Sequence, residues 1–126
     1  MIILDTNLLV RFFTRDDEKL ASKARHLLLS RKKLRIPDVV FPELEYVLSG
    51  LYDADRESVA DVYKFLLACD HIFCNPVIGK ALEIFMETKL DMADCMIAAE
   101  AVRSRTRLAT FDKGLIKSAK VKIYEL

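Results

Sequence analysis

The segment MIILDTN, residues 1–7, decides the fold class. Four apolar residues run directly into Asp5, Thr6 and Asn7, which carry a charge, a hydroxyl and an amide. A short apolar run that ends in turn-forming residues is typical of a strand buried on both faces. Strands of that kind belong to parallel sheets that helices cover. The segment therefore predicts a parallel strand whose carboxyl end presents polar side chains.

The rest of the chain alternates between strand and helix patterns. We expect further strands at residues 34–41, 72–74, 106–112 and 121–126. Helix-starting residues precede the segments between them: acids at 16–18, Pro42, Asp55, the pair Asn75-Pro76, and Asp91. Such alternation predicts an α/β fold, a three-layer α/β/α sandwich with a central, mostly parallel sheet. The length of 126 residues fits a single domain, 1–126.

Composition limits the function classes. Lys and Arg number 20 against 19 Asp and Glu, so the net charge of +1 provides no global attraction to nucleic acid or to an anionic membrane. No apolar stretch approaches the roughly 20 residues of a membrane span, and Asp5 interrupts the N-terminus too early for a secretory signal. The expected location is therefore cytoplasmic. Cys69, His71 and Cys74 form a C-x-H-x-x-C cluster, but a structural zinc site wants a fourth ligand, and none lies nearby.

Four acids fall near the rim where parallel strands end. Asp5 ends the first strand, Glu43 follows the second, Asp94 opens the helix before the fourth, and Asp112 ends the fourth. Ligands of open α/β sheets bind beyond this rim. Taken singly, each acid is explained equally well as a helix cap or a first-turn residue, which the helix dipole favours. The four together are harder to explain as caps.

The electrostatics of such a cluster favour a bound cation. Asp94 shares a helix face with Ile97, Ala98 and Ala101, where a carboxylate without a partner is costly. Two carboxylates about 4 to 5 Å apart repel by roughly 3 to 4 kcal/mol at an effective dielectric of about 20. Oxygen-only ligands select hard ions, so Mg²⁺ or Mn²⁺ is the expected cofactor. Thr6, Asn7 and Thr110 supply neutral hydrogen bonds that can orient carboxylates or waters.

The segments LDTN, PEL, DMADCMIAA and LATFD resemble, in order and context, the acidic motifs of the PIN-domain family, and the small size is similar to VapC-type toxins. That resemblance implies a Mg²⁺- or Mn²⁺-dependent ribonuclease, often a homodimer, that an antitoxin inhibits. It implies metal-binding and catalytic roles for Asp5, Glu43, Asp94 and Asp112, assisted by Thr6, Asn7 and Thr110. Asp91 is a further candidate, although helix capping explains it fully. One departure stands out: many relatives place glycine before the fourth strand, where this chain has RSRTR, residues 103–107.

RNA contacts need local cations because the net charge is near zero. The candidates that follow strands ending at the rim are Arg11, Arg15, Lys113 and Lys117. Solvated helix faces use the same residues, so this pattern does not separate binding from solubility. The arginines at 103, 105 and 107 are expected toward the opposite end of the sheet. The apolar stretches LLVRFF and VYKFLL favour a homodimer or an inhibitory peptide, although core packing is the commoner use of such stripes.

Two other function classes stay open. The first is a catalytically inactive PIN-like module that binds RNA or protein. The only sequence feature that argues against it is the retention of all four acids. The second is a receiver-like phosphoacceptor, which would need an aspartate at the end of the third strand, where Cys74-Asn75 stands. His26 and His71 lie away from the acids in the pattern, and we expect neither to act in acid-base catalysis.

Overall fold

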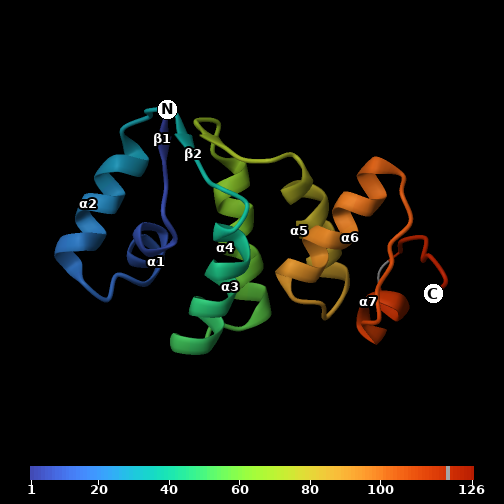
Figure 1. The fold of residues 1–126 in the computed structure, drawn as a ribbon. Helices are drawn as coiled ribbons and strands as arrows, with labels where there is room; N and C mark the ends of the chain where they lie inside the picture. Colours follow the sequence, from blue (N-terminus) through green and yellow to red (C-terminus); the bar gives the residue numbers. More distant parts are fainter. Residues whose placement is uncertain (119) are drawn as a thin grey trace. The chain divides into compact units, whose positions relative to one another are not determined.

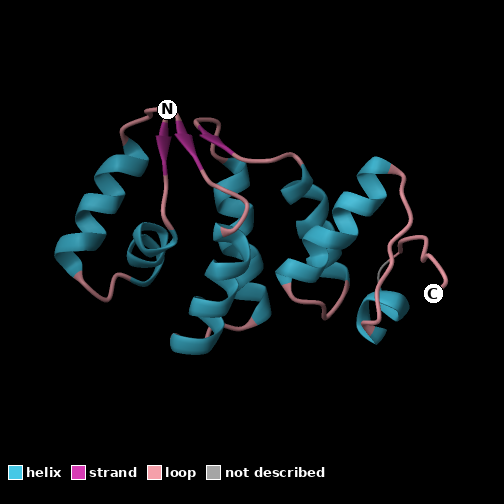
Figure 2. Ribbon diagram, viewed as in Figure 1, coloured by secondary structure: helices cyan, strands magenta, loops and turns pink. Residues whose placement is uncertain are grey.

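A computed structural model describes residues 1–118 and 120–126 of the chain. It divides into two compact units, residues 1–75 and 76–126, each of which is described by itself (Figure 1). Helices dominate both units, and the three strands lie together in the first (Figure 2).

The first unit holds a parallel sheet. Its strands, β1 (Ile2–Ile3), β2 (Leu34–Arg35) and β3 (Ile72–Phe73), pair in the order β1-β2-β3. Ile2 is in register with Leu34, and Leu34 with Ile72. All three strands run in the same direction, so the residues that follow them share one edge. The expected α/β class with a parallel sheet is therefore confirmed. The expectation that the first strand is buried on both faces was wrong: β1 lies at the edge of the sheet, and Ile2 and Ile3 are 38% and 68% exposed.

Four helices complete the first unit. They are α1 (Thr6–Thr14), α2 (Glu18–Leu29), α3 (Val40–Leu51) and α4 (Arg56–Ala68). Side chains that share the buried interior are Leu4, Leu9, Leu34, Ile36, Phe41, Leu44, Val59, Tyr63 and Leu66. Burying a leucine or phenylalanine side chain contributes about 1.5–3 kcal/mol, so this set provides the main stabilisation. The Tyr63 hydroxyl is satisfied in the core because it donates to the carbonyl oxygen of Phe41.

The second strand is shorter than the sequence predicts. Residues 34–41 were expected to be extended, but only Leu34 and Arg35 pair as β2. The chain then turns through Pro37 and Asp38, whose carbonyl oxygens accept from the N–H groups of Val40 and Phe41. Helix α3 therefore begins at Val40, ahead of the expected Pro42, which fits because a residue in the first turn has no intrahelical partner for its N–H.

The second unit is built from α5 (Val77–Glu87), α6 (Met92–Ser104) and α7 (Lys113–Ser118), with α5 beside α6 (Figure 1). The strands expected at 106–112 and 121–126 reduce to one parallel bridge between Leu108 and Ile123. The buried face of α6 carries Met92, Cys95, Ala98, Ala99 and Ala101. The expected stripe was wrong at Ile97, which is 46% exposed.

Arginines end helices where glycine is common. Arg15 after α1, Arg31 after α2 and Arg105 after α6 all take left-handed φ, at 56°, 65° and 55°. The N–H of Arg105 reaches the carbonyl oxygens of Ala101 and Val102, which closes the last turn of α6. The RSRTR joint thus forms a left-handed turn without glycine, and arginine suits the negative end of the helix dipole.

Candidate active site

Asp5 and Glu43 belong to the first unit. Asp5 follows β1 in extended conformation at the start of α1, yet its carboxylate makes no capping hydrogen bond within that helix. Glu43 lies in the first turn of α3, and one of its oxygens, Oε2, accepts a hydrogen bond of 3.0 Å from the hydroxyl of Thr6. Thr6 is 6% exposed, so its packing fixes the direction of that bond. Asp5 thus adjoins Thr6, the residue that holds Glu43.

Asp94 and Asp112 belong to the second unit. Burial raises the pKa of the Asp94 carboxyl, and the negative charges of Asp91 and Asp112 raise it further. Asp112 is fixed from two directions: its N–H donates to Thr110 Oγ1 at 3.0 Å, and its Oδ1 accepts from the N–H of Leu115 at 2.9 Å. Asp91 caps α6 by accepting from the N–H of Asp94 at 2.8 Å, as the capping interpretation anticipates.

None of the four acids has a Lys or Arg partner within 4.0 Å in the described residues. Within each unit, as far as the structure describes it, no three Asp, Glu, His or Cys side chains gather into a metal site. Each unit therefore contributes two carboxylates that have no cationic partner among the described residues. The donor chemistry fits a hard divalent cation, because every group is an oxygen and the mutual repulsion seen at Asp94 is relieved by positive charge.

Among the described residues, Cys69, His71 and Cys74 do not form a group that could hold a metal ion. Burial raises the pKa of the Cys69 and Cys74 thiols. The Nε2 atom of His71 is 2.7 Å from the carbonyl oxygen of Leu28, which ties this ring to α2.

Of the expected RNA-binding cations, Arg11 is engaged elsewhere. Its guanidinium forms an ion pair of 2.8 Å with Asp16. Arg15, Lys113 and Lys117 are exposed and form no ion pair in the described part of the chain.

An open groove in the second unit, about 770 Å³ in volume, includes Thr110 and Lys113 in its lining. Its lining also includes Phe111 and Tyr124, which the sequence interpretation missed, and Arg107, which was expected toward the opposite end of the sheet. Phe111, directly before Asp112, is 87% exposed, and the guanidinium carbon of Arg107 lies 5.1 Å from the centroid of the Tyr124 ring. Exposed aromatic rings with nearby cations suit unpaired nucleic-acid bases. The only sequence signal was the position of Phe111 beside an acid.

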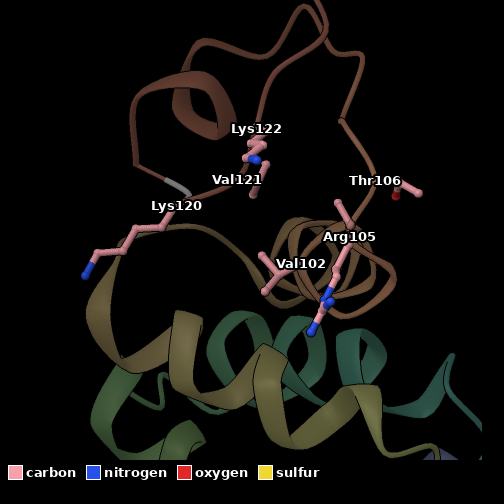
Figure 3. Close-up of a pocket in the computed structure, with 7 residues that line it drawn as sticks. Val102, Arg105, Thr106, Lys120, Val121 and Lys122 are labelled. Atoms are coloured by element: carbon pink, nitrogen blue, oxygen red, sulfur yellow. The ribbon is translucent and has the colours of Figure 1, made fainter.

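A second cavity, about 260 Å³, lies at the end of α6 (Figure 3). Val102 and Val121 line it, and Arg105, Lys120 and Lys122 surround it. The side chains of Arg105 and Lys120 extend in different directions (Figure 3). The cavity contains none of the expected acids and is therefore separate from the candidate site.

Comparisons with known proteins identify the family. The family model of the PIN domain matches residues 2–121, which include parts of both units. A VapC ribonuclease of Aquifex aeolicus (strain VF5) is 30% identical over 107 residues, which cover 80% of this chain and 78% of that protein. Among the described residues, no helix is both long and apolar enough to cross a membrane. With an almost full-length family match and a relative of this similarity, the chain belongs to the PIN-domain family.

Proposed function

We propose that this protein is a ribonuclease that hydrolyses RNA with the help of Mg²⁺ or Mn²⁺, and that it is the toxin of a toxin-antitoxin pair. The observation that carries the proposal is the set of four carboxylates without cationic partners in a chain of the PIN-domain family. The similarity to a VapC ribonuclease supports RNA as the substrate. The toxin role predicts a protein antitoxin and a cytoplasmic location.

In the proposed mechanism, Asp5, Glu43, Asp94 and Asp112 hold the ion, and residues 1–126 act as one domain. The bound ion supplies the positive charge that activates water and stabilises the leaving oxygen of the phosphodiester. Thr6 orients Glu43 through its 3.0 Å hydrogen bond, and the backbone at Leu115 holds Asp112. Asn7 and Thr110 orient neighbouring groups, and Asp91 sets the start of α6. Lys113, Lys117 and Arg15 attract the RNA backbone.

A homodimer is part of the proposal. Phe12 and Phe13 of α1 and Phe65 of α4 form a ring cluster with centroids 5.0 to 5.8 Å apart. Phe65 is 44% exposed, and the two α1 rings are half-buried. These rings derive from the LLVRFF and VYKFLL stretches, and they leave apolar area for a second copy to cover. Light scattering of the wild type and Phe65→Glu tests this: the variant is expected to be monomeric.

The test of the activity is cleavage of labelled single-stranded RNA with Mn²⁺ or Mg²⁺. The wild type is expected to cleave, and Asp5→Asn and Asp94→Asn are expected to lose cleavage and Mn²⁺ binding, measured by calorimetry, with unchanged circular dichroism. Asp61→Asn is the matched control, because in the described part of the chain Asp61 pairs only with Lys64, at 3.8 Å on the surface of α4. Equal cleavage by all four proteins would rule out the assignment. RNA binding without cleavage by the wild type would instead favour the inactive module.

A further inference from the structure

A polar network in the first unit centres on Arg11 of α1. Its Nε–H donates to Asn7 Oδ1 at 3.2 Å, one helical turn earlier, and its NH1 group donates to Asp16 Oδ1 at 2.8 Å. Asp16 is within reach because Arg15, in left-handed conformation, ends α1 and turns the chain. Arg11 therefore joins the start of α1, where Asp5 and Thr6 lie, to the loop after it.

Asp16 is itself held from a distant part of the sequence. The hydroxyl of Tyr52 donates to Asp16 Oδ2, and that of Thr14 lies 3.3 Å from Asp16 Oδ1. The hydrogen bonds from Tyr52 and Arg11 lower the pKa of the Asp16 carboxyl, so it stays ionised as the partner of Arg11. Tyr52 directly follows α3, the helix that carries Glu43. The network thus connects the helices on which Asn7 and Glu43 stand.

The charge of Arg11 is consequently matched within the protein. A guanidinium whose donors are directed at a carboxylate and an amide has fewer left for a phosphate. This differs from the sequence-based expectation, which grouped Arg11 with Arg15, Lys113 and Lys117 as RNA contacts. The geometry instead resembles a support for another side chain.

The side chain that Arg11 supports is Asn7, two residues after Asp5. An asparagine amide has an acceptor branch and a donor branch, and it can turn to present either one. With Oδ1 engaged by the Arg11 donor, the Nδ2 hydrogens are the branch that remains available. We infer that Asp16 and Tyr52 are positioning residues: through Arg11 they fix the amide of Asn7 so that it donates to an anionic oxygen of the RNA or of Asp5.

The kinetic test rests on the proposed ribonuclease activity. Its substrate is a fluorescein-labelled single-stranded RNA of mixed sequence, cleaved with Mn²⁺ at several salt concentrations. Asp16→Asn and Arg11→Lys are expected to lower kcat about tenfold, which is the lower end of the effect seen when a residue that orients a site is removed. Their KM values are expected to stay within about twofold of the wild-type value. Lys does not rescue the function, because an ammonium lacks the planar fork that reaches two acceptors. Tyr52→Phe is expected to show a smaller loss of the same kind.

The phosphate-contact alternative predicts the opposite pattern. In that case Arg11→Met raises KM, and it reduces by about one the slope of the logarithm of the RNA-binding constant against the logarithm of the salt concentration. Asp16→Asn would then lower KM, because it frees the Arg11 guanidinium to bind phosphate. Either result would overturn the inference. The matched controls are Asp61→Asn, Tyr46→Phe and Arg25→Met, which alter exposed residues of α4, α3 and α2 and are expected to leave both constants unchanged.

A readout without activity separates this inference from the proposed function. The side-chain amide signals of Asn7 in a nitrogen–proton correlation spectrum are assigned by their loss in Asn7→Asp. They are expected to shift in Asp16→Asn and Tyr52→Phe and to stay in place in the controls. Unchanged signals would overturn the positioning role even in an active enzyme. A wild type that never cleaves RNA would refute the proposed function, while shifted signals would still support the network.

Discussion

Gly114 provides a test of the Asp112 assignment. A Cβ atom at this position would lie 3.0 Å from Asp112 Oδ1 and 3.3 Å from Leu90 Cδ2, whereas ordinary contacts begin at 3.4 Å. In Gly114→Ala the carboxylate oxygen must therefore move by about 0.4 Å, given ordinary van der Waals separations. It cannot turn away freely, because the same oxygen accepts from the N–H of Leu115 at 2.9 Å.

The expected loss follows from that displacement. If a misplacement of about 1 Å costs about 100-fold in rate, a shift of about 0.4 Å costs about sixfold on a logarithmic scale. Gly50→Ala and Gly79→Ala are the matched controls, since both glycines are helical and an added Cβ meets no described atom within 4 Å. Both controls are expected to gain about 0.5–1 kcal/mol from helix propensity and to keep full activity.

Three measurements on each alanine variant suffice: the RNA cleavage rate, Mn²⁺ affinity by calorimetry, and the thermal midpoint. Gly114→Ala is expected to cleave RNA about sixfold more slowly and to bind Mn²⁺ more weakly while it stays folded. The controls are expected to melt about 2–5 °C higher than the wild type. Wild-type cleavage and wild-type Mn²⁺ affinity in Gly114→Ala would refute the reasoning that Asp112 Oδ1 is a ligand.

Three further results are expected. Because the pKa of Asp94 is raised in the folded chain, the contribution of Asp94 to stability falls as pH rises from its unfolded to its folded pKa; the free energy of unfolding of the wild type, measured relative to Asp94→Asn in urea titrations with EDTA at pH 3 to 7, should therefore fall across that window. Phe111→Ala should weaken RNA binding about 5- to 100-fold in fluorescence anisotropy if a base stacks on the ring, and Phe111→Trp should retain it; equal binding by all three would exclude stacking. Arg105→Gly should raise the free energy of unfolding by about 0.5 kcal/mol. Glycine removes the strain of the left-handed φ from the folded chain, and this gain is larger than the conformational entropy by which glycine stabilises the unfolded chain. Arg103→Gly, inside α6, should lower it by about 1 kcal/mol, and a loss in both would contradict this account.

Local pattern predicted most of the helices, because their caps are encoded nearby. Asp55 and Asp91 accept from the N–H groups of Ser58 and Asp94, three residues on, as the sequence indicates. The strand at residues 34–41 was too long because an apolar run does not separate a strand from a helix start. There, the turn hydrogen bonds to Pro37 and Asp38 decided the outcome.

The positions of the four acids were predictable because each stands at or next to an element boundary, whereas their roles stay predictions. Their supports were less visible. The hydrogen bond between Thr6 and Glu43 spans 37 positions and that between Tyr52 and Asp16 spans 36, so no local sequence spacing predicts either one. Ile97 has the right helical period for the core but is exposed. Periodicity shows which residues share a helix face, but it does not show whether another element covers that face. Whether the four acids share one ion stays a prediction.

The arginines at the helix ends also bear on proteolysis. Trypsin cuts after lysine and arginine, but it requires several residues of locally unfolded chain, which intact helices resist. Arg15, Arg31 and Arg105 are exposed and lie just beyond the last hydrogen-bonded turns of α1, α2 and α6. Brief digestion of the native protein should therefore cut first at these junctions and release pieces that contain whole helices. A chain with glycine at these places would lack those cleavage points.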